Sequence, residues 1–317
     1  MSQAAKFRKM LAEEPYVFAG GCYSPLTAKI AESQGMKMNY LSGYSFGLAH
    51  YGKGDLAFYG RSEIVDCARR ITAVTDIPLI SDADTGYGDA VQTQMTVQEF
   101  ERAGVAGIHI EDQWPPKRCG HIAGKRVIPL RQAAGKYKAA VDAKKDDDFI
   151  IIARTDAYGA QGGGLQNAID RGIAYADQGV DMLWIELPDP KRGPLIKFME
   201  EVRKRHPQMI GAFNYSSSFK WSKEEDPLTF KELGEIGYKY IFITLFGIHA
   251  GTYGMIDHYK DLAKWEQDAQ LRLENKRGDM YPGHHLLGDI PKYQEIERMY
   301  DADAMARQAE TEGFKDA

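Results

Sequence analysis

The sequence predicts an α/β protein that consists of a (β/α)8 barrel of the TIM type followed by a C-terminal helical extension. Short runs rich in valine, isoleucine, leucine and aromatic residues alternate with longer helical patterns, which is typical of a parallel sheet built from βα units. Eight such runs occur before residue 250, and eight strands close a barrel of this kind. A chain of 317 residues accommodates one barrel with an added tail.

The predicted elements follow one another along the first 250 residues. The strands are expected at residues 17–19, 38–41, 79–81, 107–110, 149–153, 182–185, 209–213 and 240–243. The helices between them are expected at residues 25–34, 62–74, 91–103, 129–143, 164–178, 193–205 and 229–236. A glycine-containing or polar turn follows each helical pattern, as is usual at helix ends.

The chain continues well beyond the eighth strand. We assign residues 1–250 to the barrel domain and residues 251–317 to the helical extension. Residues 247–276 are predicted to form one long helix, and residues 290–311 a further helical stretch. An extension of this size has to pack on its own barrel or on a neighbouring subunit, so we expect a homo-oligomer.

Composition and charge argue against several kinds of partner. The 40 lysine and arginine residues are interspersed among 45 acidic residues, and the net charge of −5 argues against nucleic acid. No run of 18 apolar residues occurs, so no membrane span is expected. The three cysteines form no CxxC pair and Met1 to Met10 lacks the apolar run of a secretion signal, which together predict a cytoplasmic protein.

Polar residues gather where the predicted strands end. In a parallel barrel, residues at and just after the C-terminal ends of the strands face one common mouth. The polar residues that the sequence places there are Ser42, Asp82, Asp84, Glu111, Arg154, Glu186, Asn214, Ser216, Ser218 and Thr244. We therefore expect the functional site at this end of the barrel.

The acidic residues at the third and fourth strand ends suggest a metal. Asp82 and Asp84 are separated by one residue, so on an extended segment both carboxylates lean the same way, and Glu111 from the next strand can approach them. Hard oxygen donors without a histidine cluster suit Mg²⁺, with Mn²⁺ as a possible replacement. The alternative is that Asp82-Ala83-Asp84 only caps a helix or turn.

Arg154 and the uncharged donors suggest a small polycarboxylate substrate. An arginine at a strand end either pairs with a structural acid or receives a substrate carboxylate. Asn214, Ser216, Ser218 and Thr244 offer donors for a second carboxylate. A nucleotide is disfavoured because the sequence has no GxxxxGK[ST] motif and no GxGxxG motif after the first strand.

Cys119 is the candidate for proton transfer. It lies within Lys117-Arg118-Cys119-Gly120-His121, where neighbouring cations favour thiolate over thiol. The segment follows the strand that ends at Glu111, and therefore belongs to the predicted mouth of the barrel. The alternative is a cysteine in a surface loop with accidental basic neighbours.

Five motifs in this order resemble the isocitrate lyase and phosphoenolpyruvate mutase superfamily. They are Leu41-Ser42-Gly43, Asp82-Ala83-Asp84-Thr85-Gly86, His109-Ile110-Glu111-Asp112-Gln113, Lys117-Arg118-Cys119-Gly120-His121 and Ala153-Arg154-Thr155-Asp156-Ala157. The second half of the chain resembles isocitrate lyases through residues 214–221 and 242–250 and through His284-His285. Arg118, the Asp82-to-Gly86 motif and the short length instead resemble methylisocitrate lyases and related oxaloacetate or dimethylmalate enzymes. Tyr44 and Asp84 depart from the long isocitrate lyases, which have tryptophan and glutamate there, so the chain resembles a short-form isocitrate lyase.

The resemblance implies cleavage of isocitrate to glyoxylate and succinate. It implies Mg²⁺ or Mn²⁺ at Asp82, Asp84, Glu111 and Asp55. It implies catalytic roles for Cys119, His121, Arg154 and Tyr40, with Cys119 protonating the succinate carbanion and Tyr40 handling the hydroxyl proton. The implied substrate-binding residues are Ser42, Gly43, Tyr44, Gly120, His121, Arg154, Glu186, Asn214, Ser216, Ser218 and Thr244.

The resemblance also implies an assembly and leaves alternatives open. The family barrel exchanges its eighth helix between paired subunits, and a homotetramer is the usual result. Methylisocitrate lyase is the nearest alternative, because one methyl group is worth only about 1 to 3 kcal/mol in a pocket. An oxaloacetate hydrolase and a scaffold without activity are further alternatives. A phosphonate-forming mutase is disfavoured, since its chemistry does not use the cysteine loop.

Overall fold

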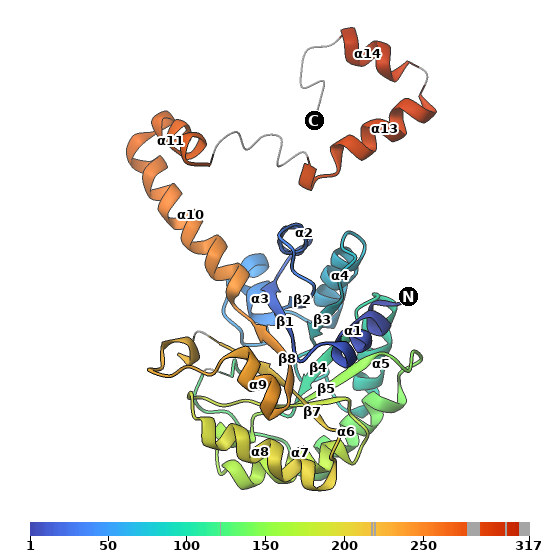
Figure 1. The fold of residues 1–317 in the computed structure, drawn as a ribbon, viewed down its shortest axis with the longest axis vertical. Coiled ribbons are helices and arrows are strands. Elements are labelled where there is room, and N and C mark those ends of the chain that lie inside the picture. Colours follow the sequence, from blue (N-terminus) through green and yellow to red (C-terminus); the bar gives the residue numbers. More distant parts are fainter. Residues whose placement is uncertain (121, 217, 219, 278–285, 302, 311–317) are drawn as a thin grey trace. The chain divides into compact units, whose positions relative to one another are not determined.

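The computed structural model describes residues 1–310 except 121, 217, 219, 278–285 and 302 (Figure 1). The chain divides into two units, Met1–His249 and Ala250–Ala317. The first unit carries all eight strands and the residues of the predicted site.

The eight strands form a closed parallel barrel in which each strand pairs with the next along the chain, and β1 pairs with β8 (Figure 1). They are β1 (Val17–Cys22), β2 (Asn39–Leu41), β3 (Leu79–Asp82), β4 (Gly107–Glu111), β5 (Ile150–Thr155), β6 (Met182–Ile185), β7 (Ile210–Asn214) and β8 (Tyr238–Ile243). The register at the closure aligns Val17 with Tyr240 and Gly20 with Ile243. The predicted barrel is confirmed, and the observed strand boundaries lie within a few residues of the predicted ones.

Helices follow the strands on the outside of the barrel. They are α2 (Pro25–Ser33), α3 (Gly43–Tyr51), α4 (Arg61–Thr72), α5 (Ala90–Arg102), α6 (Leu130–Asp142), α7 (Leu165–Ala176), α8 (Arg192–Arg205) and α9 (Phe230–Ile236). Side-chain caps fix several of their starts, as where Ser24 and Thr27 form a capping box ahead of Pro25.

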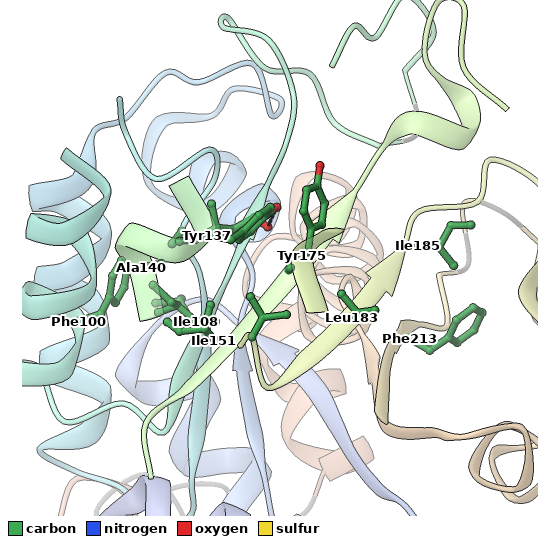
Figure 2. Packing of buried hydrophobic residues seen from close by; sticks show 14 of the residues in the cluster. Phe100, Ile108, Tyr137, Ala140, Ile151, Tyr175, Leu183, Ile185 and Phe213 are labelled. Atoms are coloured by element: carbon green, nitrogen blue, oxygen red, sulfur yellow. Dashed lines mark hydrogen bonds between the residues drawn. The ribbon is translucent and has the colours of Figure 1, made fainter. Parts of the chain in front are cut away.

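Alternate residues of each strand enter two separate cores. On β5, Ile150 and Ile152 point into the barrel, whereas Ile151 and Ala153 pack under the outer helices. Figure 2 shows part of the outer core, where Ile151 and Leu183 of neighbouring strands lie with Tyr137 and Tyr175 of the covering helices. Burial on both faces explains why the strands read as continuous apolar runs.

Two helices of the barrel unit were not predicted. Helix α1 (Gln3–Glu13) places Ala4, Phe7 and Leu11 on one buried face, and the Phe7 ring packs against Tyr240 of the inner core at 5.2 Å. Helix α3 contains two glycines, Gly43 and Gly47, which lower its intrinsic propensity and hide the helical pattern. The exchange of a helix between subunits stays a prediction.

The second unit is helical. Helix α10 (Phe246–Trp265) begins in the barrel unit and is followed by α11 (Gln267–Arg277), α13 (Ile290–Tyr300) and α14 (Ala304–Glu310). The prediction of one continuous helix over residues 247–276 is wrong, because Glu266 adopts a left-handed backbone conformation with φ of 47° and separates α10 from α11. Among the helices that the structure describes, none is long and apolar enough to cross a membrane.

Candidate active site

A small cavity opens at the C-terminal ends of the barrel strands. Ten residues that the sequence assigned to the site line it: Tyr40, Tyr44, Asp55, Asp82, Cys119, Gly120, Arg154, Glu186, Asn214 and Thr244. Trp184 and Leu245 complete the lining. The sequence did not point to Trp184, although its place at the centre of β6, two residues before Glu186, was the available signal.

The other predicted residues that the structure describes do not line the cavity. Asp84, Glu111 and Ser216 are buried, and Ser218 is exposed. The Ser42 hydroxyl accepts a hydrogen bond from the backbone N–H of Ser45 and so caps α3. His121, Ser217 and the pair His284-His285 lie outside the described residues.

Glycine is required at Gly43, where α3 begins. The Gly43 N–H donates to Asp82 Oδ2 at 3.3 Å. A Cβ at this position would lie 2.5 Å from the same oxygen and 2.3 Å from the Tyr59 hydroxyl. The glycine therefore lets the backbone approach the Asp82 carboxylate directly.

The two aspartates of the Asp82-Ala83-Asp84 motif point in different directions. Asp84 has a left-handed backbone with φ of 47°, so the segment is not extended and the prediction of parallel carboxylates is wrong. The Asp84 N–H donates to Asp82 Oδ1 at 2.9 Å. Asp82 lines the cavity, whereas the Asp84 carboxylate turns to Lys117 at 2.6 Å.

Lys117 is buried between the carboxylates of Asp55 and Asp84. Burial alone would lower the pKa of Lys117, but Asp84 and Asp55 raise it well above its ordinary value. Burial raises the pKa of Asp84 to about 7, although Lys117 opposes the rise. The sequence suggested that Lys117 tunes Cys119; the structure shows its ammonium engaged with two acids.

Arg154 is held by acids on several sides. Its Nε and Nη2 donate to the two oxygens of Asp156 at 2.8 and 2.9 Å, and Nη2 lies 3.5 Å from Glu186 Oε1. Its Nε is also 3.3 Å from Glu111 Oε2, and the guanidinium carbon lies 4.3 Å from the centre of the Trp184 ring. Of the two roles open to Arg154, pairing with structural acids is observed, and the side chain still reaches the cavity.

The site contains more acidic groups than basic ones. Six buried carboxyl groups, those of Asp55, Asp82, Asp84, Glu111, Asp156 and Glu186, surround three buried cations, Lys117, Lys125 and Arg154. Burial also raises the pKa values of Glu111 and Glu186, with Arg154 opposing both shifts. An excess of buried carboxylates is an environment that a divalent cation stabilises.

The donor set fits a cation held largely through water. Among the described residues, no three His, Cys, Asp or Glu side chains are arranged as a ready ligand set. Asp82 faces the cavity, and Glu111 Oε1 is buried without a hydrogen-bond partner among the described atoms. Mg²⁺ commonly keeps several waters and contacts only one or two carboxylates directly, so this arrangement suits it.

Tyr40 and His109 form a buried pair at the floor of the cavity. The Tyr40 hydroxyl lies 2.8 Å from His109 Nε2, and its ring stacks on Phe242 at 4.4 Å. Burial, and next the charge of Asp82, raise the pKa of Tyr40 well above its ordinary value, and burial lowers the pKa of His109 to about 4. At neutral pH the phenol therefore keeps its proton and the imidazole is uncharged.

The loop that carries Cys119 is fixed at several points. The Cys119 N–H donates to the Asp55 carbonyl at 3.2 Å, and the Gln113 side chain bonds both the N–H and the carbonyl of Arg118. Cys119 is 7% exposed and lines the cavity. Arg118 is exposed, so its charge is screened by water more than that of a buried cation.

A pair of uncharged side chains lies at the ends of the neighbouring strands β7 and β8. The Thr244 hydroxyl donates to Asn214 Oδ1 at 2.8 Å. This bond fixes the amide and directs its donor nitrogen away from Thr244. Asn214 can therefore present an oriented donor to a ligand in the cavity, and the Thr244 hydroxyl, whose one proton is used in this bond, orients it.

The fold and site define a class of protein: a (β/α)8 barrel whose mouth holds buried carboxylates, an arginine and a cysteine. The sequence model described as phosphoenolpyruvate phosphomutase matches residues 7–257. The chain belongs to the phosphoenolpyruvate mutase and isocitrate lyase superfamily.

Curated relatives with several substrates resemble this chain. An isocitrate lyase of Haloferax volcanii is 46% identical over 99% of this chain and 91% of its own. A 2,3-dimethylmalate lyase of Eubacterium barkeri is 35% identical over 95% of this chain and 99% of its own. A 2-methylisocitrate lyase of Shewanella oneidensis is 40% identical over 59% of this chain and 64% of its own. Among solved structures, a phosphoenolpyruvate phosphomutase of Streptomyces platensis superposes with a TM-score of 0.84 at 26% identity, over 94% of this chain and 99% of its own.

Proposed function

We propose that this protein is a divalent-metal-dependent lyase that cleaves isocitrate into glyoxylate and succinate. The observation that carries the proposal is one cavity that brings together Cys119, Arg154, the Asp82 carboxylate and the Asn214–Thr244 pair. Such a site offers an acid, a fixed positive charge, a place for a hard cation and oriented donors, which a hydroxy polycarboxylate requires.

Each group of residues has a separate task in this proposal. Arg154 stabilises negative charge at the hydroxyl-bearing end of the substrate, because Asp156 holds its guanidinium in one orientation. The Asn214 amide, oriented by Thr244, binds a carboxylate of the succinate half. Cys119 donates a proton to the carbanion that forms on that half when the carbon–carbon bond breaks.

The hydroxyl proton has to leave before that bond breaks. Tyr40 keeps its own proton at neutral pH, so it can take the hydroxyl proton of the substrate only by passing its own proton to His109 Nε2 in the same step.

Asp82 would hold the metal, with Asp55, Asp84 and Glu111 supplying further negative charge around it. A bound divalent cation supplies positive charge that favours ionisation of the substrate hydroxyl. We propose Mg²⁺ as this cation, with Mn²⁺ as a replacement, because both prefer oxygen donors.

We choose isocitrate over 2-methylisocitrate because of how much of this chain each kind of relative matches. The isocitrate lyase of Haloferax volcanii matches almost the whole chain, including the strand ends that carry Asn214 and Thr244, whereas the 2-methylisocitrate lyase match covers 59% of it. Leu245 and Tyr44 line the cavity and could decide the space for one methyl group.

The test is a product assay on the purified protein with Mg²⁺. Isocitrate and 2-methylisocitrate are offered in separate reactions, and kcat/KM is compared for release of glyoxylate and of pyruvate. We expect faster glyoxylate release, loss of turnover with EDTA and recovery on adding Mg²⁺. Faster pyruvate release would assign the protein to 2-methylisocitrate, and no turnover of either acid would contradict the proposal.

A further inference from the structure

A buried lysine outside the predicted site joins the cysteine loop to the barrel. Lys125 is 3% exposed, and its Nζ donates to the Gly120 carbonyl at 2.8 Å and to Asp156 Oδ1 at 2.9 Å. Gly120 follows Cys119 directly, whereas Asp156 lies just after β5. One ammonium group thus bridges two segments that are separate in the sequence.

Asp156 is the carboxylate that also orients Arg154. Lys125 and Arg154 both bond Asp156 Oδ1, and Arg154 adds a second bond to Oδ2. Although burial opposes it, Arg154 and Lys125 hold the pKa of Asp156 below its ordinary value. The position of the Cys119 loop and the orientation of Arg154 are therefore fixed by the same carboxylate.

The barrel side of this bridge is anchored. The Asp156 N–H donates to Asp112 Oδ1 at 2.9 Å. The other Asp112 oxygen accepts from Thr155, from Arg171 at 3.1 Å and from Tyr175 at 2.6 Å. Arg171 and Tyr175 belong to α7. Asp156, which Lys125 bonds, is therefore connected through Asp112 to the outer helix layer.

The loop side of the bridge lies directly on the site. A Cβ at Gly120 would lie 2.6 Å from Arg154 Nη2 and 2.0 Å from Glu186 Oε1, so the loop backbone is in contact with the arginine and its acid. A small displacement of the Gly120 carbonyl would move the Cys119 side chain relative to Arg154.

We propose that Lys125 is a positioning residue that holds the Cys119 loop in place over Arg154 through the Gly120 carbonyl. The consequence for turnover rests on the proposed role of Cys119, but the positioning itself does not. Without the ammonium, the Gly120 carbonyl loses a charge-assisted hydrogen bond and the loop opens more often. Substrate binding by the Asn214 amide, which Thr244 orients, does not depend on this bond.

The experiment compares the wild type with Lys125→Met, which removes the charge and keeps most of the side-chain volume. Cys119 is alkylated with iodoacetamide without substrate, and the modified cysteine is identified by mass spectrometry. We expect about tenfold faster labelling of Cys119, since the reaction follows loop opening. Cys22 and Cys67, both buried in the barrel unit, serve as internal references that should not change. In turnover, kcat should fall about tenfold to a hundredfold, with KM within about twofold.

Lys144→Met is the matched control. The Lys144 ammonium is also part of a mostly buried ion pair, 3.4 Å from Asp181, but Asp181 directly precedes β6 and so lies at the opposite end of the barrel. This variant should label Cys119 at the wild-type rate. Lys125→Gln, which keeps a neutral donor, provides a second variant if Lys125→Met does not fold, and it should label Cys119 at an intermediate rate.

Wild-type labelling rates in the folded Lys125 variants would overturn the inference, whatever happens to turnover. If the wild type turns over neither isocitrate nor 2-methylisocitrate but the Lys125 variants label faster, the proposed function fails and the positioning role stands.

Discussion

At the scale of single residues, Gly120 leaves no room for a side chain beside Arg154. A Cβ there would overlap Glu186 Oε1 and Arg154 Nη2, which are buried groups engaged in ion pairs. We expect Gly120→Ala to lower kcat/KM about a hundredfold, because the loop has to shift away from Arg154. Steady-state kinetics checks this, and wild-type activity would show that the loop adapts.

The control for Gly120 is Gly135→Ala. Gly135 is an exposed interior residue of α6, and a Cβ there meets nothing within 4 Å. This substitution should keep activity and raise the free energy of unfolding by about 0.5 to 1 kcal/mol, as alanine is the better helix former.

Cys119 is the residue on which the proposed chemistry depends most. Cys119→Ser keeps the size of the side chain but replaces the thiol with a much weaker acid. We expect kcat to fall by about 10² to 10⁴, with KM and the melting temperature nearly unchanged. Turnover within a factor of about two of the wild type would remove Cys119 from the mechanism.

Lys136 makes stability depend on pH in the alkaline range. It is buried on α6, its Nζ donates to the Thr85 carbonyl, and burial lowers its pKa from 10.5 to about 8. Between these two values the unfolded chain holds more protons than the folded one, so the contribution of Lys136 to the free energy of unfolding rises with pH. The stability difference between wild type and Lys136→Met should therefore shift in favour of the wild type from pH 8 to 10.5. Denaturant unfolding at several pH values measures it, and a constant difference would contradict the assignment.

At the scale of elements, α1 closes the inner core of the barrel. Phe7 is fully buried and packs against Tyr240, together with Leu11. Phe7→Ala should lower the free energy of unfolding by about 3 to 5 kcal/mol, since it removes a large buried ring. The exposed Val91 of α5 offers a control, because Val91→Ala should change it by less than about 0.5 kcal/mol. Equal effects of the two substitutions would show that α1 is dispensable.

The strands were predictable from sequence, and two kinds of helix were not. Strands buried on both faces leave uninterrupted apolar runs such as residues 149–153. Helix α1 is short and buries only three residues, and α3 contains two glycines. The break at Glu266 has no glycine or proline to signal it, because it rests on one left-handed residue.

At the scale of the whole molecule, the cavity lining was largely predictable and its ion pairs were not. Barrel topology brings the strand ends together, so residues such as Asp82, Arg154 and Asn214 could be placed from sequence alone. The ion-pair partners of Lys117 and Lys125 could not be predicted from sequence. Each lysine connects segments that are far apart in the chain, and a local sequence pattern does not indicate such pairs.

The exposed apolar side chains of α10 bear on the assembly of the whole molecule. Several large apolar side chains of α10 are exposed, including Tyr253 and Tyr259 at 66% each. We propose that a second copy of the chain covers them, and a tetramer is our expectation. Sedimentation should give a multiple of 35.5 kDa, and Tyr253→Asp with Tyr259→Asp should shift it to smaller species. A single-chain mass at micromolar concentration would contradict the proposal.

The pairing of β1 with β8 has a consequence for how copies of this protein can meet. An open sheet ends in strands with unused backbone N–H and C=O groups, which are templates for strand addition and for fibre growth. The described strands form a ring without such ends. Contacts between barrels therefore cannot form by strand addition, which pairs with almost any sequence, and depend more on side chains, whose shape and charge can be selective.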